Sequence, residues 1–261
     1  MTDAPPAPEH RDRVRIYRTE AVVLRRRDLG EADRVLTLFT RQYGKMRVVA
    51  KGSRKTKSRL AGHIEPFSRT LVLLARGRNL DIVTQAEMLN PFRQLRQDET
   101  RIAYAGYLAD LLDALTAEEQ ENHAAYDLLL GSLDRLDAGS RPFVTARHFE
   151  LRILSILGFR PELRHCGACE QPLEPVVNAF SAESGGVLCP ACRASDPRAL
   201  SLSVNALKFL RLLEQDDLAT ADRLRLSDDL RAELEDVMQV YIRHLLEREL
   251  PSFAVLKMLA G

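Results

Sequence analysis

Apolar and polar residues alternate along the first third of the chain, from residue 15 to about residue 89. An alternation of period two is the pattern of strands that bury one face. Turn residues interrupt it at Leu29-Gly30, at Tyr43-Gly44 and in the sequence RGRN after Ala75. The pattern therefore predicts five strands, at about 19–26, 34–40, 45–51, 68–75 and 80–88.

The fifth predicted strand has the longest alternation, and one set of its residues is expected to share a face: Leu80, Ile82, Thr84, Ala86 and Met88. Five short strands without a long helix suit a small closed barrel. The oligonucleotide-binding (OB) barrel is one such fold.

Beyond Pro91 the apolar residues recur every three or four positions, which is the spacing of amphipathic helices. Helices are predicted over about 102–115, over 122–136, and from an N-cap at Ser140 to Gly158. Another is expected from Ser203 to Leu213. The longest begins near Ser227 and is ended by Pro251, and a short terminal helix can follow it.

These patterns predict an α+β protein of several domains. Residues 1–14 are expected to be a disordered extension, without the apolar stretch of a secretory signal. Residues 15–90 form the predicted five-stranded OB-type barrel. Residues 91–261 form an α-helical domain, which carries a four-cysteine zinc-finger insert at about 163–195. The expected location is the cytoplasm, in association with the nucleoid.

The net charge of +1 conceals a strong asymmetry between the two parts of the chain. Residues 1–90 contain 19 Lys and Arg but 10 Asp and Glu, whereas residues 91–261 contain 19 and 27. The first part thus carries +9 and the second −8. This segregation indicates a module that faces a polyanion, joined to an ordinary acidic body.

The four cysteines form two C-x-x-C pairs, Cys166 with Cys169 and Cys189 with Cys192, separated by nineteen residues. This spacing is typical of a tetrahedral site in which four thiolates hold one structural Zn²⁺. Four protein ligands leave no position for a catalytic water. The sequence Ser184-Gly185-Gly186 is expected to form the hairpin turn that brings the pairs together. A redox dithiol pair and ligation by His165 are the alternatives.

The densest cationic stretch runs from residue 45 to residue 59, where seven Lys and Arg occur without an acid. If Met46, Val48 and Ala50 point inward, then Lys45, Arg47 and Lys51 project together from the outer face. A continuous groove that follows a phosphate backbone would combine these cations with those of neighbouring strands. The predicted nucleic-acid-binding residues are Arg25, Arg26, Arg27, Arg34, Lys45, Arg47, Lys51, Arg54, Lys55, Lys57 and Arg59.

Aromatic residues are few in this part of the chain, which favours contact with the backbone of a nucleic acid over base-specific readout. Phe39 is expected in the core, while Tyr43 and Phe67 are candidates for stacking on bases. The sequence contains no phosphate-binding GxxxxGK[ST] loop and no HExxH, GxSxG or GxGxxG motif. No residues were identified as catalytic, and no enzyme is predicted.

Long segments of the sequence resemble the bacterial RecO family of DNA repair and recombination mediators. The resemblance rests on LRRRDLGEADRVLTLFTRQYGKMRVVAKGSRKTKSRLAGHIEPF, LRILSILGFRPELRHCGAC, FSAESGGVLCPAC and LSVNALKFL, which occur in the family's order. It implies an OB barrel, a helical domain with a zinc finger, and the ligands Cys166, Cys169, Cys189 and Cys192. It also implies binding to single- and double-stranded DNA and annealing of complementary strands.

The resemblance implies protein partners as well. With RecR, members of the family help RecA to replace single-stranded-DNA-binding protein, whose acidic, hydrophobic tail binds the helical domain in some of them. No motif places that pocket in this sequence. Two other functions stay open: an RNA-binding or transcription-associated zinc scaffold, and a zinc-dependent nucleic-acid enzyme, which would need a ligand that exchanges with water.

Overall fold

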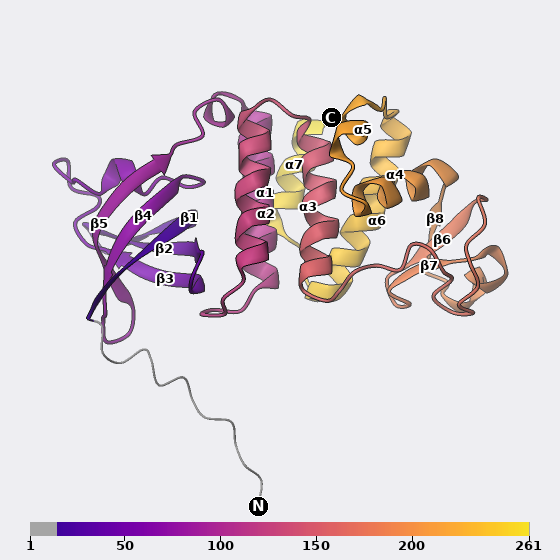
Figure 1. Cartoon of the computed structure of the whole chain (residues 1–261), viewed down its shortest axis with the longest axis horizontal. Helices are drawn as coiled ribbons and strands as arrows, with labels where there is room; N and C mark the ends of the chain where they lie inside the picture. Colours follow the sequence, from indigo (N-terminus) through magenta and orange to yellow (C-terminus); the bar gives the residue numbers. More distant parts are fainter. Residues whose placement is uncertain (1–14, 261) are drawn as a thin grey trace, which may run out of the picture. The chain divides into compact units, whose positions relative to one another are not determined.

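A computed structural model describes residues 15–260 and divides the chain into two compact units (Figure 1). The first unit combines the chain up to Pro91 with Thr116–Tyr126, and the second combines Phe92–Leu115 with the chain from Asp127 on. The predicted disordered extension, residues 1–14, lies outside the described residues. No helix among residues 15–260 is both long enough and apolar enough to cross a membrane.

The first unit is built on a closed five-stranded barrel (Figure 1). Its strands are β1 (Ile16–Leu29), β2 (Asp33–Thr40), β3 (Gly44–Ala50), β4 (Arg69–Ala75) and β5 (Asp81–Asn90). Around the barrel the order is β1-β2-β3-β5-β4, with β3 and β5 parallel and the other neighbours antiparallel. The predicted OB-type barrel is therefore confirmed. A 3-10 turn, η1 (Ala61–His63), lies between β3 and β4.

Alternate residues of the strands fill the barrel, as the period-two pattern requires. Leu36 and Leu38 of β2 and Met46, Val48 and Ala50 of β3 belong to this core. Burial of such side chains is the main stabilising contribution to a domain of this size. The inward direction predicted for the third strand is confirmed.

The predicted face of the fifth strand is wrong. Val83, not Thr84, lies in the core, and the register shifts so that Leu73 pairs with Gln85 while Leu74 pairs with Val83. This bulge adds one residue, Thr84, to β5 and reverses the faces on either side of it. The alternation from Leu80 to Met88 therefore does not describe a single face.

The second unit is a set of packed helices: α1 (Glu99–Leu115), α2 (His123–Asp137), α3 (Pro142–Ile156), α4 (Val204–Glu214), α5 (Leu218–Arg223), α6 (Asp228–Leu246) and α7 (Pro251–Ala260). The first turn of α2 is assigned to the first unit. A 3-10 turn, η2 (Leu95–Gln97), precedes α1. Helix α3 is largely buried and packs against α1, α4 and α6, so it forms the centre of this core.

The helix starts predicted at Ser203 and near Ser227 are confirmed, and both serines are N-caps whose hydroxyls accept hydrogen bonds from the backbone N–H groups of Ala206 and Leu230. Three details differ from the prediction. The N-cap of α3 is Arg141, not Ser140. The short helix α5 was not predicted. Helix α6 ends at Leu246, where Glu247 adopts a left-handed conformation, and Pro251 opens α7 instead of ending α6.

A small three-stranded sheet lies between α3 and α4 (Figure 1), and its last strand follows the predicted end of the insert at about residue 195. It consists of β6 (Asn178–Ser181), β7 (Gly186–Leu188) and β8 (Leu200–Leu202), in the order β7-β6-β8. A 3-10 turn, η3 (Pro190–Ser195), follows β7. Each strand has only three or four residues, so no alternation was detectable in the sequence.

Candidate metal centre and nucleic-acid interface

The four cysteines converge on one point of the insert. Their Sγ atoms all lie within 4.8 Å of one another, and those of Cys169 and Cys189 are 3.9 Å apart. Four thiolates at about 2.3 Å from a central Zn²⁺ would lie about 3.8 Å apart at the corners of a tetrahedron. The geometry thus fits the predicted ligand set. His165 is outside the cluster, and its Nδ1 lies 3.7 Å from a carboxylate oxygen of Glu162.

The hairpin between β6 and β7 brings the two cysteine pairs together. Ser181 pairs with Gly186, and Gly185 has a φ of 68° in the turn, which confirms the predicted hairpin. The chain before the first pair runs beside β7, because Val187 donates to the carbonyl of Glu162 and Gly167 donates to that of Val187, both at 2.9 Å. The backbone thereby places both knuckles on the same side of the hairpin.

Two thiols of this cluster have pKa values that are shifted in opposite directions. Burial opposes ionisation of Cys166, but hydrogen bonds from the backbone N–H groups of Cys189, Cys169 and Ala168 lower its pKa to about 6. Hydrogen bonds to the Cys189 and Cys169 sulfurs raise the pKa of Cys192 to about 12. Cys192 therefore keeps its proton near neutral pH unless a cation takes its place. A divalent soft metal ion would replace these protons, which is the chemistry of a structural zinc site.

A second candidate site lies at one end of the barrel, where the loop after β3 packs on the turn between β1 and β2. The backbone N–H of Arg54 donates to the carbonyl of Ala32 at 2.9 Å, and its guanidinium donates to that of Gly30 at 2.8 Å. The N–H of Gly52 donates to a carboxylate oxygen of Asp33 at 2.7 Å. These contacts fix the start of the loop and gather cations from three segments.

We call this surface the basic end: Arg27, Arg34, Lys51, Arg54, Lys55, Lys57 and Arg59. Arg34 and Arg54 each lie 3.4 Å from Asp28, so their charges are partly neutralised. The other five side chains are exposed, and none has an ion pair within residues 15–260. Outside this surface, Arg26 of β1 pairs with Glu65 at 2.5 Å, and Arg25 of the same strand is half-buried.

The first half of β3 differs from the prediction. Lys45 is buried and does not project beside Arg47 and Lys51, because residues 116–126 fold back onto the barrel and cover it. Arg47 is exposed but forms an ion pair with Glu118, with 2.7 Å between Nε and Oε1. The predicted row of cations along β3 is therefore interrupted by an acidic segment about seventy residues away in sequence. Nothing near β3 in the sequence marks this contact.

Two of the three aromatic residues considered for this surface, Phe39 and Tyr43, are engaged in packing. Phe39 is fully buried, as predicted for a core residue. The ring of Tyr43 packs edge-on against that of Tyr17, with 5.0 Å between centroids. Phe67 is half-buried in a left-handed backbone conformation, with a φ of 64°. These arrangements leave cations as the main groups that the barrel offers to a ligand.

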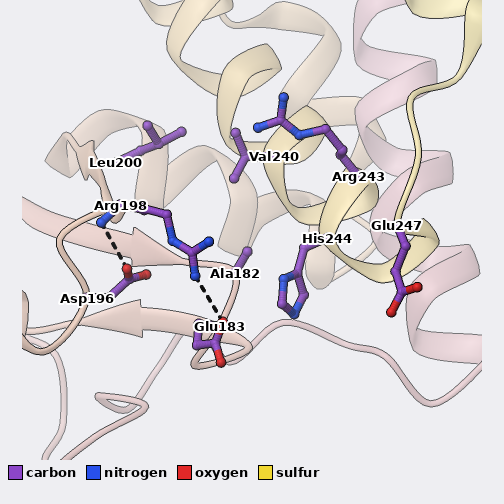
Figure 2. A pocket seen from close by; sticks show the side chains of 9 residues that line it. All are labelled: Ala182, Glu183, Asp196, Arg198, Leu200, Val240, Arg243, His244 and Glu247. Carbon is purple, nitrogen blue, oxygen red and sulfur yellow. Dashed lines mark hydrogen bonds and ion pairs between the residues drawn. The ribbon is translucent and has the colours of Figure 1, made fainter.

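A pocket of about 530 Å³ in the second unit has a mixed lining (Figure 2). Arg198, from the segment before β8, points toward Glu183 of the β6–β7 loop, at 3.3 Å, while Arg243 and His244 come from the end of α6. Three carboxylates, those of Glu183, Asp196 and Glu247, accompany these three basic side chains. The three carboxylates outnumber the two arginines, so this pocket is not a cationic site.

Comparison with known proteins covers most of the chain. The family model "Recombination protein O N terminal" matches residues 14–92, and "Recombination protein O C terminal" matches residues 96–253. A DNA repair protein RecO from Roseiflexus sp. (strain RS-1) is 49% identical over 244 residues, which are 94% of this chain and 86% of that relative. One from Symbiobacterium thermophilum is 40% identical over 240 residues, 91% of this chain and 95% of the relative. The chain therefore belongs to the RecO family of DNA repair and recombination proteins.

Proposed function

We propose that this protein is a non-enzymatic recombination mediator that binds single- and double-stranded DNA through the basic end and anneals complementary strands. The observation that carries the proposal is the basic end itself. Three segments converge there, hydrogen bonds fix the start of the loop, and five exposed cations have no ion pair within the described residues. A loop whose backbone is already held in place loses less conformational entropy on binding a polyanion than a mobile loop does.

Annealing follows from neutralisation of charge. Two complementary strands repel each other through their phosphates, and cations that contact both strands reduce this repulsion while the bases pair. No nucleotide hydrolysis is needed, because base pairing itself releases the free energy. Contacts of this kind release condensed counterions, so the affinity for DNA falls steeply as the salt concentration rises.

Charge reversal at two unpaired cations tests the proposal. Lys51→Glu/Lys55→Glu should weaken binding to single-stranded DNA of any sequence and slow annealing. It should also reduce the slope of log affinity against log salt by about 1.4, since each lost contact contributes about 0.7. Fluorescence anisotropy at several salt concentrations measures both quantities.

The matched control for this experiment is Arg223→Glu/Arg248→Glu, which changes the net charge equally at two exposed positions of the second unit. Its affinity should stay close to that of the unchanged protein. If the barrel variant binds with full affinity and an unchanged salt slope, the basic end is not the DNA-binding surface.

We propose further that single-stranded-DNA-binding protein docks on the second unit through its acidic, hydrophobic tail. A pocket of about 440 Å³ there has a floor of Phe209, Leu212, Leu224, Leu226 and Leu230, while Lys208 and Arg225 are the charged residues of its lining. No carboxylate lines it. An apolar floor beside two cations is complementary to such a tail, because it can bury the apolar side chains and pair the acidic ones.

RecR and RecA complete the proposed assembly. In this scheme, docking of the tail brings the barrel to DNA that single-stranded-DNA-binding protein covers. The protein and RecR then help RecA to replace it on the strand. The zinc site maintains the fold of the insert and has no step in this exchange, since its four ligands fill the coordination shell of the ion.

A further inference from the structure

The segment that covers the start of β3 has an unusual composition, Thr116-Ala-Glu-Glu-Gln-Glu121, with three carboxylates in six residues and no cation. We call residues 116–121 the acidic strap. It belongs to the same compact unit as the barrel. Glu118 forms a parallel bridge with Lys45, and the N–H of Glu119 donates to the carbonyl of Lys45 at 2.8 Å. The strap thus pairs with the edge of β3 through an isolated β-bridge.

The topology of the barrel leaves room for this addition. On that side of β3, only Val48 and Val49 pair with β5, through Asp81 and Ile82. The backbone of residues 44–47 would otherwise present an unpaired edge. The strap occupies this edge instead, next to the cations of the strand.

The fit is close. A Cβ at Gly44, where φ is 63°, would lie 1.8 Å from the carbonyl oxygen of Gln120, so only glycine allows this approach. Glu119 adopts a left-handed conformation, with a φ of 58°. This conformation is unfavourable for a residue with a Cβ and is tolerated where surrounding contacts impose it. The strap is therefore held in a specific place on the barrel and does not cover it loosely.

The strap also pairs with a cation on the outer face of β3. A carboxylate oxygen of Glu118 lies 2.7 Å from Nε of Arg47, and both side chains are about half exposed, at 46% and 55%. The carboxylate occupies the position in which a DNA phosphate would contact this guanidinium. Lys45 beneath it is buried. Ion pairs this exposed are weak and are screened by salt, so a polyanion can displace the carboxylate.

We propose that the acidic strap is a built-in competitor for the phosphate backbone of DNA. In the absence of DNA, Glu118 of the strap neutralises Arg47. The first contacts with DNA are therefore confined to the basic end. A strand that continues from Lys51 along β3 must displace Glu118 before it can contact Arg47. This inference rests on the proposed DNA-binding function, because a competitor matters only where DNA binds.

The test uses Glu118→Gln in the full-length protein, since glutamine keeps the shape of the side chain and removes its charge. We expect this variant to bind an unstructured single strand of about 20 nucleotides more tightly, by about threefold to fivefold near 50 mM salt. We also expect its salt slope to steepen by about 0.7, the contribution of one added phosphate contact. Glu183→Gln is the matched control, because Glu183 also forms an exposed ion pair with an arginine, Arg198, but in the second unit.

A second pair of variants shows whether the gain passes through Arg47. Arg47→Gln should change the affinity little in the unaltered protein, where Glu118 already neutralises the guanidinium. In the Glu118→Gln background the same change should abolish the gain. If Arg47→Gln weakens binding equally in both backgrounds, then Arg47 contacts DNA with the strap in place, and the proposal is wrong.

The remaining outcomes separate this inference from the proposed function. If Glu118→Gln behaves like Glu183→Gln while Lys51→Glu/Lys55→Glu loses affinity, the strap does not compete, and the basic end still binds DNA. If none of the barrel variants alters binding, both proposals fail. Circular dichroism of each variant, with an unchanged thermal transition, confirms that the barrel is intact.

Discussion

At the scale of single residues, the zinc ligands could be predicted from the sequence, whereas the environment of the cations could not. The spacing of Cys166, Cys169, Cys189 and Cys192 is specific, since few other sites need two such pairs. A lysine carries no comparable signal. Lys45 and Lys51 look alike in the sequence, yet one is buried and the other exposed, because a distant segment covers only the first. Burial of a charged residue depends on tertiary contacts that no local pattern encodes.

Two turn glycines of the barrel allow a direct test of the fit at Gly44. Gly30 and Gly44 both have positive φ, at 57° and 63°, but a Cβ at Gly30 would meet nothing within 4 Å. Gly30→Ala should therefore cost about 1 kcal/mol of unfolding free energy, from the backbone conformation alone. Gly44→Ala should cost about 3 kcal/mol, because it also displaces the backbone at Gln120. Urea unfolding measures both values, and equal values would contradict the close approach of the strap.

At the scale of elements, strands and helices of seven or more residues were predicted with small errors at their ends. Two kinds of feature were not predicted. The strands β6, β7 and β8 are too short to show a period, and α5 has only six residues. The bulge at Thr84 changes the face of β5 without changing its composition. Periodicity reports regular structure, so it fails where an element is very short or locally irregular.

The metal centre makes a prediction at this scale. The purified protein should contain one zinc ion per chain, and Cys169→Ser/Cys192→Ser should contain none. Loss of the metal should destabilise the insert around β6, β7 and β8, because binding free energies of this kind reach about 10 kcal/mol or more. Elemental analysis and hydrogen exchange of the insert measure these effects. His165→Ala should retain the metal, and loss of zinc from that variant would show that the ligand set is wrong.

At the scale of the whole molecule, the opposite charges of the two parts separate the proposed tasks. Cations gather on the barrel, and the second unit offers an apolar pocket with two basic residues in its lining. The charge asymmetry, the closed barrel and the cysteine cluster could all be predicted from the sequence. The pocket could not, since Phe209 and Leu230 belong to separate helices that are brought together only in the fold.

Annealing assays should distinguish the two tasks. Lys208→Glu/Arg225→Glu should anneal bare complementary strands normally but lose annealing of strands covered with single-stranded-DNA-binding protein, because its acidic tail would be repelled. Lys51→Glu/Lys55→Glu should fail with both substrates. The rate of duplex formation, followed by fluorescence, measures this difference. If the pocket variant anneals covered strands at the normal rate, the tail docks elsewhere.

The path of the chain through the first unit has a consequence for its synthesis. The barrel sequence ends near residue 90, but the strap that completes the edge of β3 comes only after α1. During translation, the five strands thus emerge before their last neighbour does. A fragment that stops at residue 90 should therefore expose a bare strand edge and self-associate.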